Sequence, residues 1–127
     1  MNVDFRVERD ALLLALERET RPSARAEAAE SLCDVAFETP RAQQEEFAPA
    51  LVKLLADEQP EVKCAGLALA AEILAPAEAR DVLIRALTHG VARVRIEAVG
   101  RLADLALPDT RGALAAALED AELGVRF

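Results

Sequence analysis

A valine followed by a basic residue recurs at nearly constant spacing, and this recurrence limits most strongly what the chain can fold into. The pairs are Val62–Lys63, Val94–Arg95 and Val125–Arg126. A leucine precedes each valine by eleven positions and a turn residue precedes it by five; these are Leu51, Leu83 and Leu114, and Asp57, His89 and Asp120. A period of about 30 residues predicts similar structural units that stack in a row.

An earlier and weaker unit has Ala24–Arg25 in place of the valine–basic pair, and its distance to Val62 exceeds the usual spacing by six positions. The extra positions fall in the stretch FETPRAQQEEF, which contains Pro40 and which we expect to form a longer link or a lengthened helix start. We therefore expect one domain over residues 1–127 with four units. Their approximate bounds are 5–38, 39–75, 76–107 and an incomplete 108–127.

Within each unit the apolar residues recur at steps of three and four, which is the period of a helix. The composition agrees, because the chain is 53% apolar with much alanine and only 3% aromatic residues. The pattern predicts an all-α protein, an α-solenoid of three full helix pairs and the first helix of a fourth. The expected helices are 6–18, 23–37, 43–56, 60–74, 77–88, 92–105 and 109–119.

The second helix of each pair is apolar on two faces, so we expect it to be buried on two sides. One face, expected to pack on its own partner helix, comprises Ala28, Gly66, Ala98, Leu32, Ala70, Leu102, Val35, Ile73 and Leu105. The other, expected to stack on the next unit, comprises Ala26, Cys64, Ile96, Ala29, Leu67, Val99, Cys33, Ala71 and Ala103. Both cysteines fall in this stacking set, which favours free thiols used as small apolar residues.

The segment PALVKLLADEQPEVKCAGLALAAEIL resembles a HEAT or HEAT-like repeat, with Pro49, Asp57, Val62 and Lys63 at the signature positions. The other units depart from it: the third has Asp81 and His89 at two of these slots, and the first has Ala11, Glu19 and Ala24. The resemblance implies hydrogen-bonded ladders between units. The candidates are Glu19, Asp57 and Asp120 with Arg25, Lys63 and Arg95, and His89 is expected to weaken the ladder at its centre.

The formal net charge of −8 counts against nucleic acids and against anionic membranes as partners. No apolar run approaches the roughly 20 residues that span a bilayer, and the N-terminal stretch lacks the features of a signal peptide. We therefore expect a cytoplasmic protein. One histidine and two separated cysteines give no metal cluster and no nucleophile–base pair, so we expect neither a cofactor nor catalysis.

The resemblance also implies that the second helices line a concave face. The strip of these helices between the two apolar sets holds six acids and no base: Glu27, Glu30, Asp34, Glu72, Glu97 and Asp104. We expect this acidic ridge to receive a basic segment of a protein partner. The alternative is a solvated face on a protein that is acidic throughout.

The last helix is apolar around much of its circumference, unlike the polar cap that usually ends a repeat array. We expect it to form a surface for a second copy of the chain or for a next repeat. The residues are Ala113, Leu114, Ala117, Leu118, Val125 and Phe127. The fourth unit stops after its first helix, which predicts a fragment of a longer array.

Two other functions stay open. Some HEAT-like proteins are bilin lyases, so the resemblance allows a chromophore-handling protein as an alternative to a non-catalytic scaffold or adaptor. The chain is alternatively a regulatory part of a larger multidomain protein.

Overall fold

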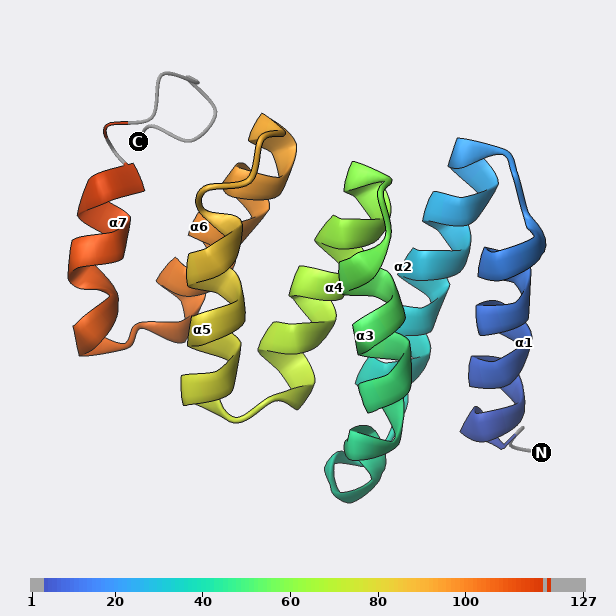
Figure 1. Ribbon diagram of the computed structural model, residues 1–127. Coiled ribbons are helices and arrows are strands. Elements are labelled where there is room, and N and C mark those ends of the chain that lie inside the picture. The colour runs from blue at the N-terminus through green and yellow to red at the C-terminus, as the bar shows by residue number, and fades with distance from the viewer. Residues whose placement is uncertain (1–3, 118, 120–127) are drawn as a thin grey trace.

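The computed structural model describes residues 4–117 and 119, and this part of the chain is helical without any strand. Its α-helices are α1 (Phe5–Arg18), α2 (Pro22–Glu38), α3 (Ala48–Ala56), α4 (Pro60–Ile73), α5 (Pro76–Ala86), α6 (Ala92–Leu105) and α7 (Arg111–Ala117). Two 3₁₀ helices, η1 (Arg41–Phe47) and η2 (Pro108–Thr110), precede α3 and α7. The helices form a row with α1 and α7 at opposite ends (Figure 1). The predicted all-α class is confirmed for this part of the chain.

Prolines mark the starts of three helices. Pro22, Pro60 and Pro76 each occupy the first turn of α2, α4 and α5, where a missing N–H removes no intrahelical hydrogen bond. At the start of α1 the Asp4 carboxylate accepts a hydrogen bond from the Arg6 backbone N–H at 2.8 Å. Most helix ends fall close to their predicted positions.

The predicted helix 43–56 is wrong at its start, because residues 41–47 form a 3₁₀ helix and α3 begins only at Ala48. Pro49 provides the physical reason. In an α-helix that began at residue 43, Pro49 would lie in the interior, where its ring collides with the carbonyl one turn earlier. In the observed structure Pro49 lies in the first turn of α3, where it is tolerated.

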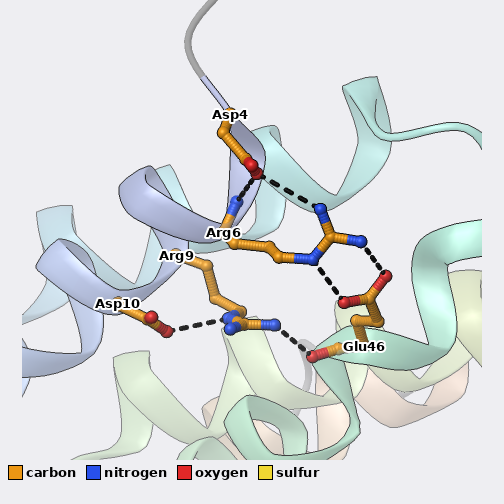
Figure 2. A network of polar contacts seen from close by, with 5 residues as sticks. All are labelled: Asp4, Arg6, Arg9, Asp10 and Glu46. Atoms are coloured by element: carbon orange, nitrogen blue, oxygen red, sulfur yellow. Dashed lines mark hydrogen bonds and ion pairs between the residues drawn. The ribbon is translucent and has the colours of Figure 1, made fainter.

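The 3₁₀ segment is fixed against α1 by aromatic and charged contacts. Phe47 is fully buried and stacks on Phe5, with ring centroids 5.8 Å apart. Arg6 donates two hydrogen bonds to the Glu46 carboxylate, at 2.7 and 2.8 Å, while Arg9 donates to the Glu46 carbonyl at 3.0 Å (Figure 2). The inserted residues therefore form part of the packing between the first two helix pairs.

The helices pack in pairs, α1 on α2, α3 on α4 and α5 on α6, and the second helices also pack in series, α2 on α4 and α4 on α6. Two adjoining apolar clusters result. The first contains Leu32, Leu54 and Leu69, and the second contains Leu67 and Leu102. Because α4 contributes Ala70 to the first cluster and Leu67 to the second, it is buried on two sides, as the double apolar face predicted.

The spacing of α3 and α4 is set by a close contact at Gly66. A Cβ added there would lie 3.0 Å from Leu55 Cδ2 and 3.1 Å from the Leu55 backbone nitrogen. At the equivalent position, the other two helix pairs have a buried alanine, Ala28 in α2 and Ala98 in α6. Backbone cannot move aside as a flexible side chain does, so the α3–α4 spacing requires a glycine at this position.

Both cysteines lie where the second helices stack. The Cys33 thiol donates to the Ala65 carbonyl of α4 at 3.2 Å, and the Cys64 thiol donates to the Arg93 carbonyl of α6 at 3.8 Å. Both are free and buried, and burial, with Asp34 nearby, raises the pKa of the Cys33 thiol to about 12. The corresponding stacking residue of α6, Ile96, is 41% exposed.

Candidate functional site

A hollow of about 290 Å³ lies on the face formed by α2, α4 and α6, where the acidic ridge was predicted. Its lining combines four carboxylates, two guanidinium groups, one phenyl ring and small residues. These are Glu30, Asp34, Glu61, Glu97, Arg93, Arg101, Phe37, Cys33, Cys64, Ala65 and Ala68. Three of the six predicted ridge acids thus lie around one depression.

Glu30 and Asp34 are exposed on α2, whereas Glu97 is half-buried on α6. The two helices place their carboxylates on either side of the small residues of α4. Both Ala65 and Ala68 line the hollow from α4, and Ala65 is 8% exposed because α2 covers it. Small side chains at this point leave the depression that the flanking acids surround.

The predicted strip itself contains no base, but two arginines outside it contribute positive charge to the same hollow. Arg101 donates from Nε to Glu97 Oε2 at 2.7 Å, one helical turn away, and Arg93 lies at the start of α6. The four carboxylates and two guanidinium groups leave a formal charge of −2. The i, i+4 spacing of Glu97 and Arg101 is a sequence signal for this ion pair.

The other three ridge acids do not line the hollow. Glu27 and Asp104 are exposed on α2 and α6. Glu72 is half-buried, and its Oε1 accepts a hydrogen bond from Gln44 Nε2 at 3.3 Å. Because Gln44 also donates to the Ala36 carbonyl at 3.0 Å, Glu72 helps to hold η1 against α2 and α4.

Phe37 and Glu61 line the hollow but were absent from the predicted ridge. Phe37 is 44% exposed, a large apolar surface next to the acids. It follows Asp34 by three positions, which places it on the same side of α2, and this spacing is the signal that would have identified it. Glu61 lies in the first turn of α4, where a carboxylate is favoured by the helix dipole.

The predicted ladder between units is present at the first junction. Arg25 of α2 donates to both carboxylate oxygens of Asp57, at 3.1 and 2.5 Å, and these side chains are only 21% and 12% exposed. The Arg25 guanidinium lowers the pKa of Asp57 below its ordinary value of 3.8. Glu19, by contrast, pairs with Arg21 in its own turn, which lowers the pKa of Glu19 to about 2.

The ladder differs in the next unit. Lys63 donates to the Leu55 carbonyl at 3.0 Å, within its own helix pair. Arg95 donates to the His89 carbonyl at 2.7 Å, and Asp120, the remaining candidate, lies outside the described residues.

The predicted docking surface on the last helix is only partly accessible. Ala117 is 9% exposed, and it packs with Val99 of α6 against Leu87 and Leu114. The expectation that Ala117 lies on the outer surface is therefore wrong, because its side chain is used in the α6–α7 contact. Ala113 and Leu114 are half-buried, while Leu118, Val125 and Phe127 lie outside the described residues.

Within the described residues, no three histidine, cysteine or acidic side chains gather as a metal site would require. No helix in this part of the chain has the length and apolar character to cross a membrane. Comparison with known proteins gives no match to any protein-family model and no match to a curated protein.

Proposed function

We propose that the protein is a HEAT-like α-solenoid that acts without catalysis, as a scaffold or adaptor binding a basic segment of another protein. The repeated valine–basic pair and the serial packing of α2 on α4 and α4 on α6 support this architecture. The face of the second helices is the proposed binding surface. In this account the three full pairs correspond to α1/α2, α3/α4 and α5/α6.

One observation carries the proposal: carboxylates from different helices surround a single hollow that also has an exposed phenyl ring. Glu30 and Asp34 of α2 lie far from Glu97 of α6 in the sequence, yet all three line one depression. Lysine or arginine side chains of a bound segment would contact these acids, and an apolar residue would contact Phe37. Charged groups of this kind give specificity and association rate, whereas the aromatic contact contributes affinity.

The two arginines make the surface selective. A uniformly positive chain would meet Arg93 at one edge and Arg101 beside Glu97, and like charges at an interface are unfavourable. The surface therefore fits a segment in which basic and apolar residues alternate better than it fits a run of lysines.

The test is fluorescence anisotropy of a labelled peptide in which lysine and leucine alternate. Glu30→Lys with Asp34→Lys changes the formal net charge from −8 to −4, and we expect it to weaken binding at least tenfold. The matched control is Glu58→Lys with Glu78→Lys, two exposed acids outside the hollow, which produces the same net charge. Equal losses in both variants would mean that only net charge matters and would overturn the proposal.

The chromophore-handling alternative stays a prediction, and absorbance of added bilin tests it directly. Dimerisation through the end that carries α7 also stays a prediction. The residues proposed to form that surface are now Ala113, Leu114 and those outside the described part of the chain, since Ala117 is buried.

A further inference from the structure

A second kind of hollow lies at the turns that join the helices of each pair, and it occurs at two corresponding places. The first, about 320 Å³, contains two complete acid–base pairs. Arg25 pairs with Asp57, and Lys53 pairs with Glu17 at 2.8 Å. Each positive group in this first turn hollow therefore has a carboxylate partner.

The second turn hollow has a volume of about 270 Å³. It is lined by the equivalent positions of the following units, but some of these positions carry different residues. When each unit is aligned with the next, Lys63 takes the place of Arg25 and Arg85 takes the place of Lys53, so both basic positions are kept. The two acidic positions are changed, because Leu55 aligns with Glu17 and His89 aligns with Asp57. No carboxylate lines this hollow in the described structure.

His89 keeps one role of the acid that it replaces. Asp57 Oδ1 accepts a hydrogen bond from the Gln59 backbone N–H at 2.8 Å, and His89 Nδ1 accepts one from the Val91 backbone N–H at 3.0 Å. The turn is thus closed in the same way in both places. Because Nδ1 is the acceptor, the ring proton lies on Nε2, which is left as a donor.

The two basic side chains also keep free donor groups. Lys63 uses one of its three ammonium protons on the Leu55 carbonyl. Arg85 is exposed and forms no ion pair with any described residue. Two nearby acids are engaged elsewhere, since Asp57 pairs with Arg25 and Asp81 pairs with Arg80.

The remaining lining of the second turn hollow is apolar: Leu55, Leu67, Val82, Ala86 and Val94. Leu67 and Val94 are each 2% exposed and belong to the second apolar cluster. A site with a few convergent polar donors on an apolar wall is the usual form of a small-molecule site. The hollow is small, so its ligand must be small as well.

We infer that the second turn hollow binds a small organic carboxylate. Its carboxylate lies between the three polar side chains and accepts hydrogen bonds from Lys63, Arg85 and Nε2 of His89, so that it pairs with Lys63 as the Asp57 carboxylate pairs with Arg25 at the first junction. Its hydrocarbon part lies against Leu67 and Val82. Charge-assisted hydrogen bonds to a carboxylate are about twice as strong as neutral ones, and here they offset the repulsion of an anion by the formal net charge of −8.

Isothermal titration calorimetry with sodium octanoate tests the inference, with octanol and inorganic phosphate as comparison probes. We expect octanoate to bind, and each comparison probe to bind at least tenfold more weakly, because one lacks the charge and the other lacks the hydrocarbon. Octanol binding equal to that of octanoate would reduce the site to an apolar cleft. Phosphate binding without octanoate binding would show an adventitious ion only. Either result overturns the inference, as does the absence of octanoate binding.

Two variants locate the site. His89→Asp supplies the carboxylate that the first junction has, and Lys63→Gln removes a charge while keeping a donor for the Leu55 carbonyl. Both should weaken octanoate binding at least tenfold. The matched control, Arg111→Gln on α7, makes the same change in net charge as Lys63→Gln away from the hollow and should leave binding unchanged. Equal weakening in all three variants contradicts the assignment, and circular dichroism confirms that each variant is folded.

Discussion

The two junctions between the helix pairs have the same arrangement of helices but different chemistry. At the first, Arg25 bridges α2 to Asp57 and Gln59, and Gln59 donates back to the Pro22 carbonyl at 2.8 Å. At the second, α4 and α6 pack through apolar side chains, and the Cys64 thiol donates to the Arg93 carbonyl. The Cys33 thiol donates to the Ala65 carbonyl in the same way at the first junction, so the two junctions share their apolar packing and this hydrogen bond and differ at the polar turn positions.

The difference matters for what each junction offers a ligand. At the first junction each basic side chain has a carboxylate partner, since Arg25 pairs with Asp57 and Lys53 pairs with Glu17. The second keeps Lys63 and Arg85 but has His89 in place of the acid. Replacing the acids of such a charge pair therefore leaves its bases without a carboxylate partner, and we infer that this makes the second junction a binding position.

The largest effect should come from the helix that both junctions share. In α4, Gly66→Ala places a methyl group against the Leu55 backbone, and we expect a loss of about 1–3 kcal/mol in the free energy of unfolding. Gly100→Ala is the control, because nothing lies within 4 Å of that position in α6. It should gain about 0.5–1 kcal/mol, since alanine is the better helix former. Urea denaturation measures both, and equal effects would contradict the close approach of α3 and α4.

Removing the charge pair of the first junction should have the next largest effect on stability. Asp57→Asn leaves Arg25 largely buried without its carboxylate, and we expect a loss of about 1–2 kcal/mol, between the values for exposed and buried pairs. The loss should depend on pH. Because the folded-state pKa of Asp57 lies below 3.8, its contribution is complete above that pH and disappears as the pH falls below it.

Chemical denaturation of the wild type and Asp57→Asn from neutral pH into the acid range follows this dependence. The two stabilities should converge at the acid end of the series. A difference that stays constant with pH would mean that the pair contributes through packing and not through charge.

A smaller gain is expected when the acid is restored at the second junction. His89→Asp should form an ion pair with Lys63 and stabilise the protein by about 0.5–1 kcal/mol, since both positions are only half-buried and ion pairs open to solvent contribute modestly. The gain should vanish in the Lys63→Gln background, which a double-mutant cycle measures. A gain of the same size in both backgrounds would show that the aspartate acts within its own turn.

The smallest effect should lie outside both junctions. Ala106 follows α6 in the left-handed conformation, with φ of 51°, where a Cβ is unfavourable. Ala106→Gly should raise the melting temperature slightly, by an amount equivalent to about 0.5 kcal/mol. A fall in melting temperature would mean that the alanine side chain stabilises the folded state by more free energy than the left-handed conformation costs.

Much of the helical framework could be predicted from spacing alone, because apolar residues at three- and four-residue steps leave few other ways to bury them. Where the sequence prediction was wrong, a local effect was responsible. Pro49 delayed the start of α3, and Ala117 proved to be buried on α6. Neither effect is visible in the repeat period.

The candidate site was predicted less completely. The columns of acids indicated Glu30, Asp34 and Glu97, but which of them surround one hollow depends on how α2 and α6 face each other across α4. Glu72 could not be placed by aligning the units, because it accepts a hydrogen bond from Gln44 of the inserted 3₁₀ helix. The inserted residues have no counterpart in the other units, so an alignment of the units gives no information about their contacts.

His89 is the only histidine in the chain, so its imidazole gives a single set of resonances in an NMR spectrum. Titration with octanoate, followed at the His89 Hε1 proton, tests most directly whether the second junction is an anion site. We predict a saturable shift in the wild type that is lost in Lys63→Gln and retained in Arg111→Gln. A His89 resonance that does not move while octanoate reaches millimolar concentration would contradict the difference between the two junctions on which this account depends.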